Sequence, residues 1–193
     1  MASGYGKSFL KLDNGVLRVN AWKDIGALLD WIKNQGDLDA DRVIVQGGSY
    51  GGYMALSVAT NYSERIRAAI SDSGPSNLVT FNENTAGWRR ELQRVEFGDG
   101  RDPKVREFLE RTAPVHHADK IKKPLFIIQG RNDPRVPATE GQQMVAAAKK
   151  NGIPVWYLLA KDEGHDWSKK ANRDFRLYAI ALFVQEQLLK QAP

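Results

Sequence analysis

The sequence predicts an α/β fold in which a mostly parallel β-sheet carries helices on both of its faces. The first observation is a set of short apolar runs typical of strands, at residues 43–45, 68–70, 125–128 and 155–159. The second is that segments with helical periodicity or capping signals lie between and around these runs. Strands that alternate with helices form parallel sheets with right-handed crossovers, so we expect one such domain.

The composition is that of an ordinary globular domain, with 193 residues of which 42% are hydrophobic and 26% charged. No apolar run approaches the roughly 20 residues that a membrane span needs, and the first residues lack the apolar core of a secretion signal. We therefore expect a cytoplasmic protein without membrane contact. The chain contains no cysteine, which excludes a disulfide framework, a thiolate nucleophile and a thiolate metal site.

The charge pattern does not indicate nucleic-acid binding. The net charge is +5, but lysine and arginine are scattered among aspartate and glutamate. The densest basic group consists of Arg89, Arg90, Arg94 and Arg101, and no recognition motif accompanies it. We interpret this group as a solvated face.

The chain begins with residues 1–20, which contain three glycines and little periodicity and are predicted to be loop. Residues 21–34 are predicted to be an amphipathic helix, because apolar side chains recur along one stripe. The stripe consists of Trp22, Ile25, Leu28, Leu29 and Ile32. Residues 36–41 are a turn into the first strand.

The stretch from Arg42 to Ala59 organises the rest of the chain. The apolar run at 43–45 is followed by Gly47-Gly48-Ser49-Tyr50-Gly51-Gly52 and then by a helical apolar segment at 53–59. Strand, glycine turn and buried helix are the context in which G-x-S-x-G forms a nucleophile elbow. Glycine on either side of the serine removes clashes with the strand and the helix. A glycine-rich phosphate loop and a plain turn are the alternatives.

The middle of the chain is less regular. Residues 61–67 are predicted to be a surface turn before the second strand, which ends at residues 72–75. Residues 78–111 are mixed and partly helical. Within them, Asp102-Pro103 has the pattern of an N-cap followed by proline at the first helical position.

The last third repeats the strand and helix alternation. The third strand is followed by a turn at 130–134, and Thr139 to Gln142 has the pattern of a capping box that opens a helix ending at Lys150. The fourth strand is followed by a loop at 162–166. A final helix is predicted over 172–189, with its apolar stripe formed by Phe175, Tyr178, Leu182 and Leu189.

Three candidate catalytic residues, Ser49, Asp133 and His165, each follow the end of a strand. Catalytic groups in parallel sheets lie at these carboxyl ends, and the chain order Ser, Asp, His is that of α/β-hydrolases. His165 would take the proton of the Ser49 hydroxyl, and Asp133 would orient the imidazole. The backbone N–H of Tyr50 would be an oxyanion donor.

Each of these assignments has an alternative. Asp133 precedes a proline and on its own could be only a turn former. The rival acids Asp162, Glu163 and Asp166 crowd the His165 loop instead of ending another strand, and His116 and His117 precede the third strand, in the wrong order for this fold. No cluster matches a metal site, so we expect neither a metal nor a cofactor.

These motifs resemble the catalytic domain of the prolyl oligopeptidase family of serine peptidases, nearest to its acylaminoacyl peptidase branch. The resemblance rests on residues 4–6, 47–53, 130–137 and 163–165 and extends over essentially the whole chain. It implies Ser49, Asp133 and His165 as the catalytic triad. It also implies a substrate pocket at Tyr50 and Val136, completed by Phe81 and Trp88, for which ordinary core packing is the alternative.

The sequence departs from the family pattern in several respects. Nothing in it could form the family's β-propeller. The strands and the arginine that precede the Gly4-Tyr5-Gly6 loop in relatives are missing, as is the part that usually supplies a second oxyanion donor. His165 is followed by Asp166-Trp167, where relatives tend to have a glycine and an aromatic residue. We therefore expect residues 1–193 to form a single truncated α/β-hydrolase domain.

Two expectations follow from this truncation. The strand at 43–45 becomes an edge, and an apolar edge favours a homodimer or higher oligomer. With one oxyanion donor lost, we expect an esterase that acts on short acyl esters. The alternatives are an oligopeptidase or aminoacyl-peptide hydrolase with a short peptide substrate, and a non-catalytic assembly or binding module.

Overall fold

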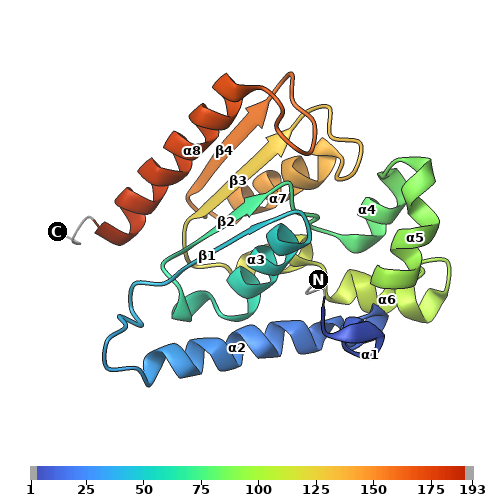
Figure 1. The fold of residues 1–193 in the computed structure, drawn as a ribbon, viewed down its shortest axis with the longest axis horizontal. Coiled ribbons are helices and arrows are strands. Elements are labelled where there is room, and N and C mark those ends of the chain that lie inside the picture. Colours follow the sequence, from blue (N-terminus) through green and yellow to red (C-terminus); the bar gives the residue numbers. More distant parts are fainter. Residues whose placement is uncertain (1–3, 190–193) are drawn as a thin grey trace.

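The computed structural model describes residues 4–189, which form an α/β fold around one parallel sheet (Figure 1). The strands are β1 (Ile44–Gly48), β2 (Ala68–Asp72), β3 (Leu125–Gly130) and β4 (Val155–Ala160), in the spatial order β1-β2-β3-β4. Every neighbouring pair is parallel, so all carboxyl ends meet at one edge of the sheet. The predicted fold class is confirmed.

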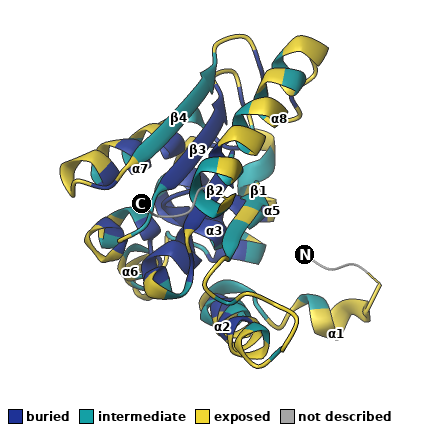
Figure 2. Ribbon diagram, turned by 90° about the vertical axis from the view of Figure 1, so that its left-hand side faces the viewer, coloured by how far each residue is buried: buried dark blue, intermediate teal, exposed yellow. Residues whose placement is uncertain are grey.

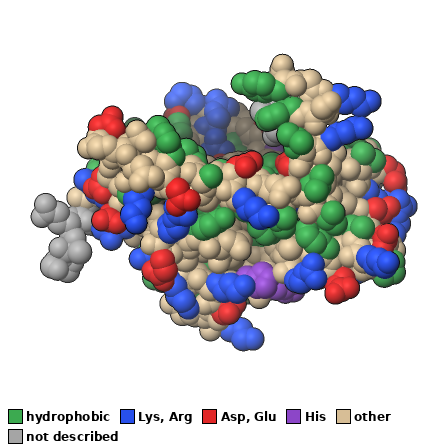
Figure 3. Space-filling view, turned by 90° about the horizontal axis from the view of Figure 1, so that it is seen from below, with side chains coloured by type: hydrophobic (Ala, Val, Ile, Leu, Met, Phe, Trp, Pro, Cys, Tyr) green, Lys and Arg blue, Asp and Glu red, His purple; other side chains and the backbone are tan. Residues whose placement is uncertain are grey.

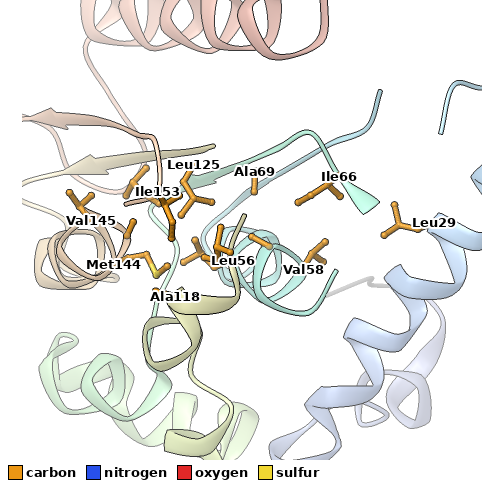
Figure 4. Close-up of a cluster of buried hydrophobic side chains, with 14 residues drawn as sticks. Leu29, Leu56, Val58, Ile66, Ala69, Ala118, Leu125, Met144, Val145 and Ile153 are labelled. Carbon is orange, nitrogen blue, oxygen red and sulfur yellow. The ribbon is translucent and has the colours of Figure 1, made fainter. Parts of the chain in front are cut away.

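Helices cover both faces of the sheet, as predicted. On one face lie α2 (Val19–Lys33), α3 (Tyr50–Asn61) and α7 (Ala138–Lys150), and on the other lies α8 (Lys170–Val184). The alternation of side chains along each strand explains this arrangement. Leu125 and Ile127 of β3 join the core shown in Figure 4, while Phe126 and Ile128 pack in a second cluster that includes Phe183 of α8.

The amino-terminal part is more ordered than predicted. Residues 1–20 were expected to be loop, but the structure has α1 (Gly6–Leu10) and the 3₁₀ turn η1 (Gly15–Arg18), and α2 begins at Val19. The reason is tertiary: Arg18 is buried, and its Nη2 donates to the carbonyl of Glu96 at 2.8 Å. The prediction that Leu28 belongs to the buried stripe of α2 is also wrong, since its side chain is exposed.

The segment between β2 and β3 forms a small helical layer beside the carboxyl ends of the strands. Its elements are α4 (Leu78–Asn84), α5 (Gly87–Phe97), α6 (Pro103–Arg111) and η3 (Pro114–Lys120), and the short turn η2 (Ser63–Arg65) precedes β2. The predicted cap of α6 is confirmed, because Asp102 accepts from the backbone N–H of Lys104 at 2.8 Å.

Two predictions about the last helices are wrong. The helix α7 begins at Ala138 after Pro137, and no side chain caps it, so Thr139 to Gln142 is not a capping box. Instead Glu140 points into the core, where it binds other donors.

The predicted stripe of the final helix lies outside the core, because Phe175, Tyr178 and Leu182 are exposed and Phe183 is the buried contact. These three side chains instead line an open groove beside Trp156 and Leu158 of the outer strand β4. The helix continues beyond its last α-helical residue as a π-helical turn, η4 (Gln185–Leu189).

The two outer strands are less buried than the two inner ones (Figure 2). Within the described residues β1 pairs only with β2, which confirms that the strand before Ser49 is an edge strand. None of the helices in residues 4–189 combines the length and the hydropathy that crossing a bilayer requires.

Candidate active site

Ser49 lies on a strained turn between β1 and α3. Its φ and ψ are 54° and −119°, and residues other than glycine rarely adopt such a positive φ. The turn is tight, since a Cβ atom on Gly47 would lie 2.1 Å from the carbonyl oxygen of Gly51. The Ser49 N–H donates to the carbonyl of Asp72 at 2.8 Å, which anchors the turn to β2. This is the geometry that the predicted nucleophile elbow requires.

Tyr50 is the first residue of α3, and the N–H groups of a first helical turn have no partner within the helix. The positive end of the helix dipole lies at the same place. The Tyr50 N–H can therefore donate to negative charge that develops on an oxygen beside Ser49.

Asp133 and His165 lie together after β3 and β4. The distance between Asp133 Oδ2 and His165 Nδ1 is 2.6 Å. The other carboxylate oxygen, Oδ1, accepts from the N–H groups of Arg135 at 2.8 Å and Val136 at 2.9 Å. With Asp133 as a carboxylate acceptor, this contact fits the neutral imidazole tautomer that carries its proton on Nδ1, in which Nε2 can accept a proton.

The His165 loop packs closely on the end of β3. A Cβ atom on Gly130 would lie 2.4 Å from the carbonyl oxygen of Gly164, and the Asn132 N–H donates to the carbonyl of Glu163 at 2.9 Å. Glycine at 130 therefore permits the approach that brings His165 to Asp133.

The rival acids have other contacts. Glu163 is buried and accepts from the N–H groups of Ser168 at 2.8 Å and Lys169 at 3.0 Å, and its hydrogen bond from Asn172 is the main cause of its lowered pKa. Asp162 pairs with Lys169, and Asp166 lies on the surface 3.4 Å from Arg135. Glu163 is thus a residue that orders the His165 loop.

The two other histidines lie away from these groups, in η3. His116 Nε2 is 2.8 Å from Glu110 Oε2, and His117 Nε2 is 2.6 Å from the carbonyl of Arg111. Both contacts are near the surface, as expected.

Ser49 and His165 are placed at the same edge of the sheet, but Ser49 Oγ makes no hydrogen bond to His165 within residues 4–189. Both lie near the end of β2. Ser49 is bonded to Asp72 through its backbone, and burial raises the pKa of the Asp72 carboxyl, while Arg176, Ser73 and His165 act to lower it. His165 is therefore within electrostatic range of the strand end that holds Ser49.

A small cavity of about 30 Å³ lies beside Ser49. Three of the four predicted pocket residues line it: Tyr50, Phe81 and Val136. Trp88 is 73% exposed and is not among the lining residues, which corrects its predicted place. Its helix α5 instead contributes Arg89 and Gln93.

The helix α5 is held at the cavity by the turn that precedes it. Thr85 Oγ1 donates to the carbonyl of Arg135 at 2.7 Å, and the Ala86 N–H donates to the carbonyl of Pro134 at 3.0 Å. These bonds tie α5 to the turn that carries Asp133.

Arg18 is a supporting residue that the sequence did not reveal. Its guanidinium carbon lies 4.7 Å from the ring centroid of Tyr50 and 4.6 Å from that of Phe97. The Tyr50 hydroxyl donates to Asp13 at 3.2 Å, and burial is the main cause that raises the Tyr50 pKa to about 12. These contacts fix the side chain of the residue next to Ser49. The role of Arg18 depends on contacts with segments that are distant in sequence, so no local pattern indicates it.

Two of the four arginines in the basic group on and after α5 are ion-paired. Arg94 pairs with Glu91, and Arg101 pairs with Asp99 at 2.6 Å, where its hydrogen bond lowers the Asp99 pKa to about 2. On the face shown in Figure 3, lysine and arginine alternate with acidic and apolar side chains. In the described part of the chain, no three His, Asp or Glu side chains are grouped so that they could hold a metal ion.

Comparison with known proteins identifies the family. A family model described as the prolyl oligopeptidase family matches residues 2–191. Dipeptidyl peptidase family member 6 of Caenorhabditis elegans is 35% identical over 191 residues, which are 97% of this chain and 26% of that protein. Dipeptidyl aminopeptidase BIII of Pseudoxanthomonas mexicana is 36% identical over 174 residues, which are 89% of this chain and 25% of that protein.

A solved structure of a puromycin-hydrolyzing peptidase from Mycobacterium tuberculosis has a TM-score of 0.80 and 28% identity, over 86% of this chain and 25% of its own. The chain thus spans about a quarter of the length of these relatives. Because the family model matches nearly every residue, the chain belongs to the prolyl oligopeptidase family.

Proposed function

We propose that the protein is a serine hydrolase that cleaves short acyl esters with Ser49, His165 and Asp133. The observation that carries this proposal is the 2.6 Å contact between Asp133 and His165, at the sheet edge where Ser49 occupies a strained elbow. Membership of the prolyl oligopeptidase family supports it.

In the proposed reaction, Ser49 Oγ attacks the ester carbonyl carbon while His165 Nε2 takes the hydroxyl proton. The tetrahedral oxyanion is stabilised by the Tyr50 N–H at the start of α3. His165 then gives the proton to the leaving alkoxide, which departs as an alcohol and leaves an acyl-enzyme. In the second half of the reaction, water attacks the acyl-enzyme carbonyl carbon while His165 Nε2 takes a proton from it. His165 then gives this proton to Ser49 Oγ as the bond between that oxygen and the acyl group breaks, which releases the acid. Asp133 keeps the imidazole oriented and stabilises its charged form.

The proposed preference for esters rests on the oxyanion site. Tyr50 is the only donor assigned to it, and loss of one such donor typically slows acyl transfer about 100- to 1,000-fold. Esters with good leaving groups tolerate such a loss better than amides. Peptide hydrolysis is the second candidate, because the relatives are named as peptidases.

Ser49→Ala is expected to abolish hydrolysis of p-nitrophenyl butyrate and labelling by a fluorophosphonate probe. The wild type is expected to show higher kcat/KM on this ester than on an aminoacyl p-nitroanilide, measured side by side. Higher efficiency on the anilide would favour the peptidase. If folded wild type is not labelled at Ser49, the non-catalytic binding module would be the better description.

We also propose that the protein forms a homodimer or higher oligomer through the β1 edge. The edge adjoins an apolar groove of about 520 Å³ lined by Ile32, Leu38 and Val43. A second copy would pair with the open hydrogen-bonding groups of β1 and cover this groove. Light scattering at micromolar concentration is expected to give at least twice the monomer mass. Val43→Lys should shift that mass to the monomer, and a wild type that is monomeric would contradict the proposal.

A further inference from the structure

The helix α5 has an unusual distribution of polar and apolar side chains. Its outward residues Trp88, Leu92 and Val95 are apolar and strongly exposed. Arg89 and Gln93, one turn apart, line the cavity beside Ser49. The side that a surface helix normally makes apolar therefore carries polar groups here, at the point nearest to the nucleophile.

Each of these two side chains has a buried polar atom without a hydrogen bond, although the Arg89 guanidinium also lies over the Trp88 ring, 5.2 Å from its centroid. Gln93 is only 2% exposed, and its Oε1 is buried without a hydrogen bond within residues 4–189. The Arg89 Nε is likewise buried, and no described residue accepts a hydrogen bond from it. Native structures rarely leave buried polar atoms unpaired, so the Arg89 Nε–H indicates an acceptor that enters the cavity, and the unpaired Gln93 oxygen leaves that amide free to turn.

The charge at the cavity is positive. Arg89 and Arg135 line it, and no Asp or Glu of the described chain is among the lining residues. Arg135 forms an ion pair with the exposed Asp166, with 3.4 Å between Nη1 and Oδ1. Arg89 forms no ion pair within residues 4–189. The Gln93 amide can turn its NH₂ group toward an anion without loss, because its oxygen has no bond to break.

The walls of the cavity limit the size of the group. Phe81 and Phe97 meet edge to face, with ring centroids 5.7 Å apart, and both line the cavity. A volume of about 30 Å³ is enough for one or two water molecules, so only a small group fits between these rings without moving them.

We infer that the cavity beside Ser49 binds a short acidic side chain on the acyl side of the scissile bond, with Arg89 and Gln93 as its specificity-determining residues. The inference rests on the proposed function, since it names the acyl group that the proposed hydrolase prefers. A carboxylate would accept hydrogen bonds from the Arg89 Nε–H and the Gln93 amide, and charge-assisted bonds of this kind are stronger than neutral ones.

The test compares α-ethyl esters of N-acetyl-aspartate, N-acetyl-asparagine and N-acetyl-alanine by proton release, with Ser49→Ala as the blank. Aspartate and asparagine have the same shape, so their ratio isolates the charge. The expected result is a kcat/KM for the aspartyl ester about 10- to 100-fold above that for the asparaginyl ester. The ratio is expected to decrease with added salt.

Two variants connect this preference to α5. Arg89→Met is expected to lower the aspartyl-to-asparaginyl ratio of kcat/KM about tenfold or more. Arg94→Met is the matched control, because it removes the same charge from the same helix at a residue that does not line the cavity. An aspartyl ester cleaved no faster than the asparaginyl or alanyl ester would overturn the inference and leave the hydrolase standing.

A binding measurement keeps the inference testable if no ester is cleaved. Calorimetry on Ser49→Ala should show N-acetyl-aspartate ethyl ester binding about tenfold or more tightly than the asparagine ester, and the added Arg89→Met change should remove the difference. Absence of Ser49-dependent turnover with this binding intact would refute only the proposed function. Equal binding of the two esters would refute the inference.

Discussion

Asp133→Asn is expected to lower kcat/KM for the short esters about 10⁴-fold while the protein remains folded. The reason lies in the two oxygens of the carboxylate. Oδ1 accepts from the N–H groups of Arg135 and Val136, and Oδ2 faces His165 Nδ1 at 2.6 Å. Asparagine keeps its oxygen toward the two backbone donors, so its NH₂ group faces Nδ1. The imidazole must then accept at Nδ1 and carries its proton on Nε2, where it can no longer take one from Ser49.

The measurement is steady-state hydrolysis of p-nitrophenyl butyrate, with urea unfolding to establish that the variant is folded. Asp166→Asn is the matched control, because it makes the same change on an exposed acid next to His165. The control is expected to stay within about a factor of two, since surface substitutions change little. An Asp133→Asn enzyme that keeps a tenth of the wild-type rate would mean that another acid orients His165.

The elements that the sequence predicted well are those whose signals are local. The apolar runs at 43–45, 125–128 and 155–159 predicted strands, and each corresponds to a strand of the parallel sheet. The G-x-S-x-G pattern encodes its own turn, because a Cβ on Gly47 would collide with Gly51. The strand ends then bring Asp133 and His165 together, since every carboxyl end meets at the same edge.

The parts that could not be predicted depend on contacts between distant segments. Arg18 is a charged residue in a glycine-rich segment, and only its contacts with Tyr50, Phe97 and Glu96 explain its burial. Gln93 appears as a surface residue of a polar helix until α5 is placed against the cavity.

The apolar stripe of α8 was identified from periodicity, but periodicity does not say whether a partner is present. Phe175, Tyr178 and Leu182 remain exposed in an open groove beside Trp156 and Leu158 of β4. The same limit applies to Glu140, which lies within the predicted Thr139–Gln142 capping box and is buried by contacts with distant residues.

Glu140→Ala is expected to lower the free energy of unfolding by about 3 kcal/mol or more, because each buried donor left unpaired costs about 1–3 kcal/mol. Glu140 is fully buried on α7 and accepts from the backbone N–H groups of Ser76 at 2.9 Å and Asn77 at 3.0 Å. The Thr80 hydroxyl donates to it at 2.6 Å, and Gln143 Nε2 at 3.0 Å. One carboxyl group thus joins α7 to the loop after β2 and to the start of α4.

Urea unfolding measures this effect, and Glu107→Ala is the control, because Glu107 is an exposed glutamate on α6 whose loss should change stability by less than about 0.5 kcal/mol. A Glu140→Ala loss as small as the control's would show that the carboxyl group does not hold the two segments together.

Glu140→Gln tests the charge of this carboxyl group separately from its hydrogen bonds. Burial raises the pKa of Glu140 in the folded protein, so the fold binds the proton more tightly than the unfolded chain does. The stabilisation that results is fully present below the unfolded pKa of about 4.3 and is lost as the pH rises through the folded value. Glu140→Gln does not titrate at this position. The free energy of unfolding of the wild type, relative to that of the variant, should therefore be highest near pH 4 and decrease toward neutrality. A wild type that gains stability over the variant between pH 4 and 7 would mean that the hydrogen bonds donated to Glu140 outweigh its burial and favour the carboxylate.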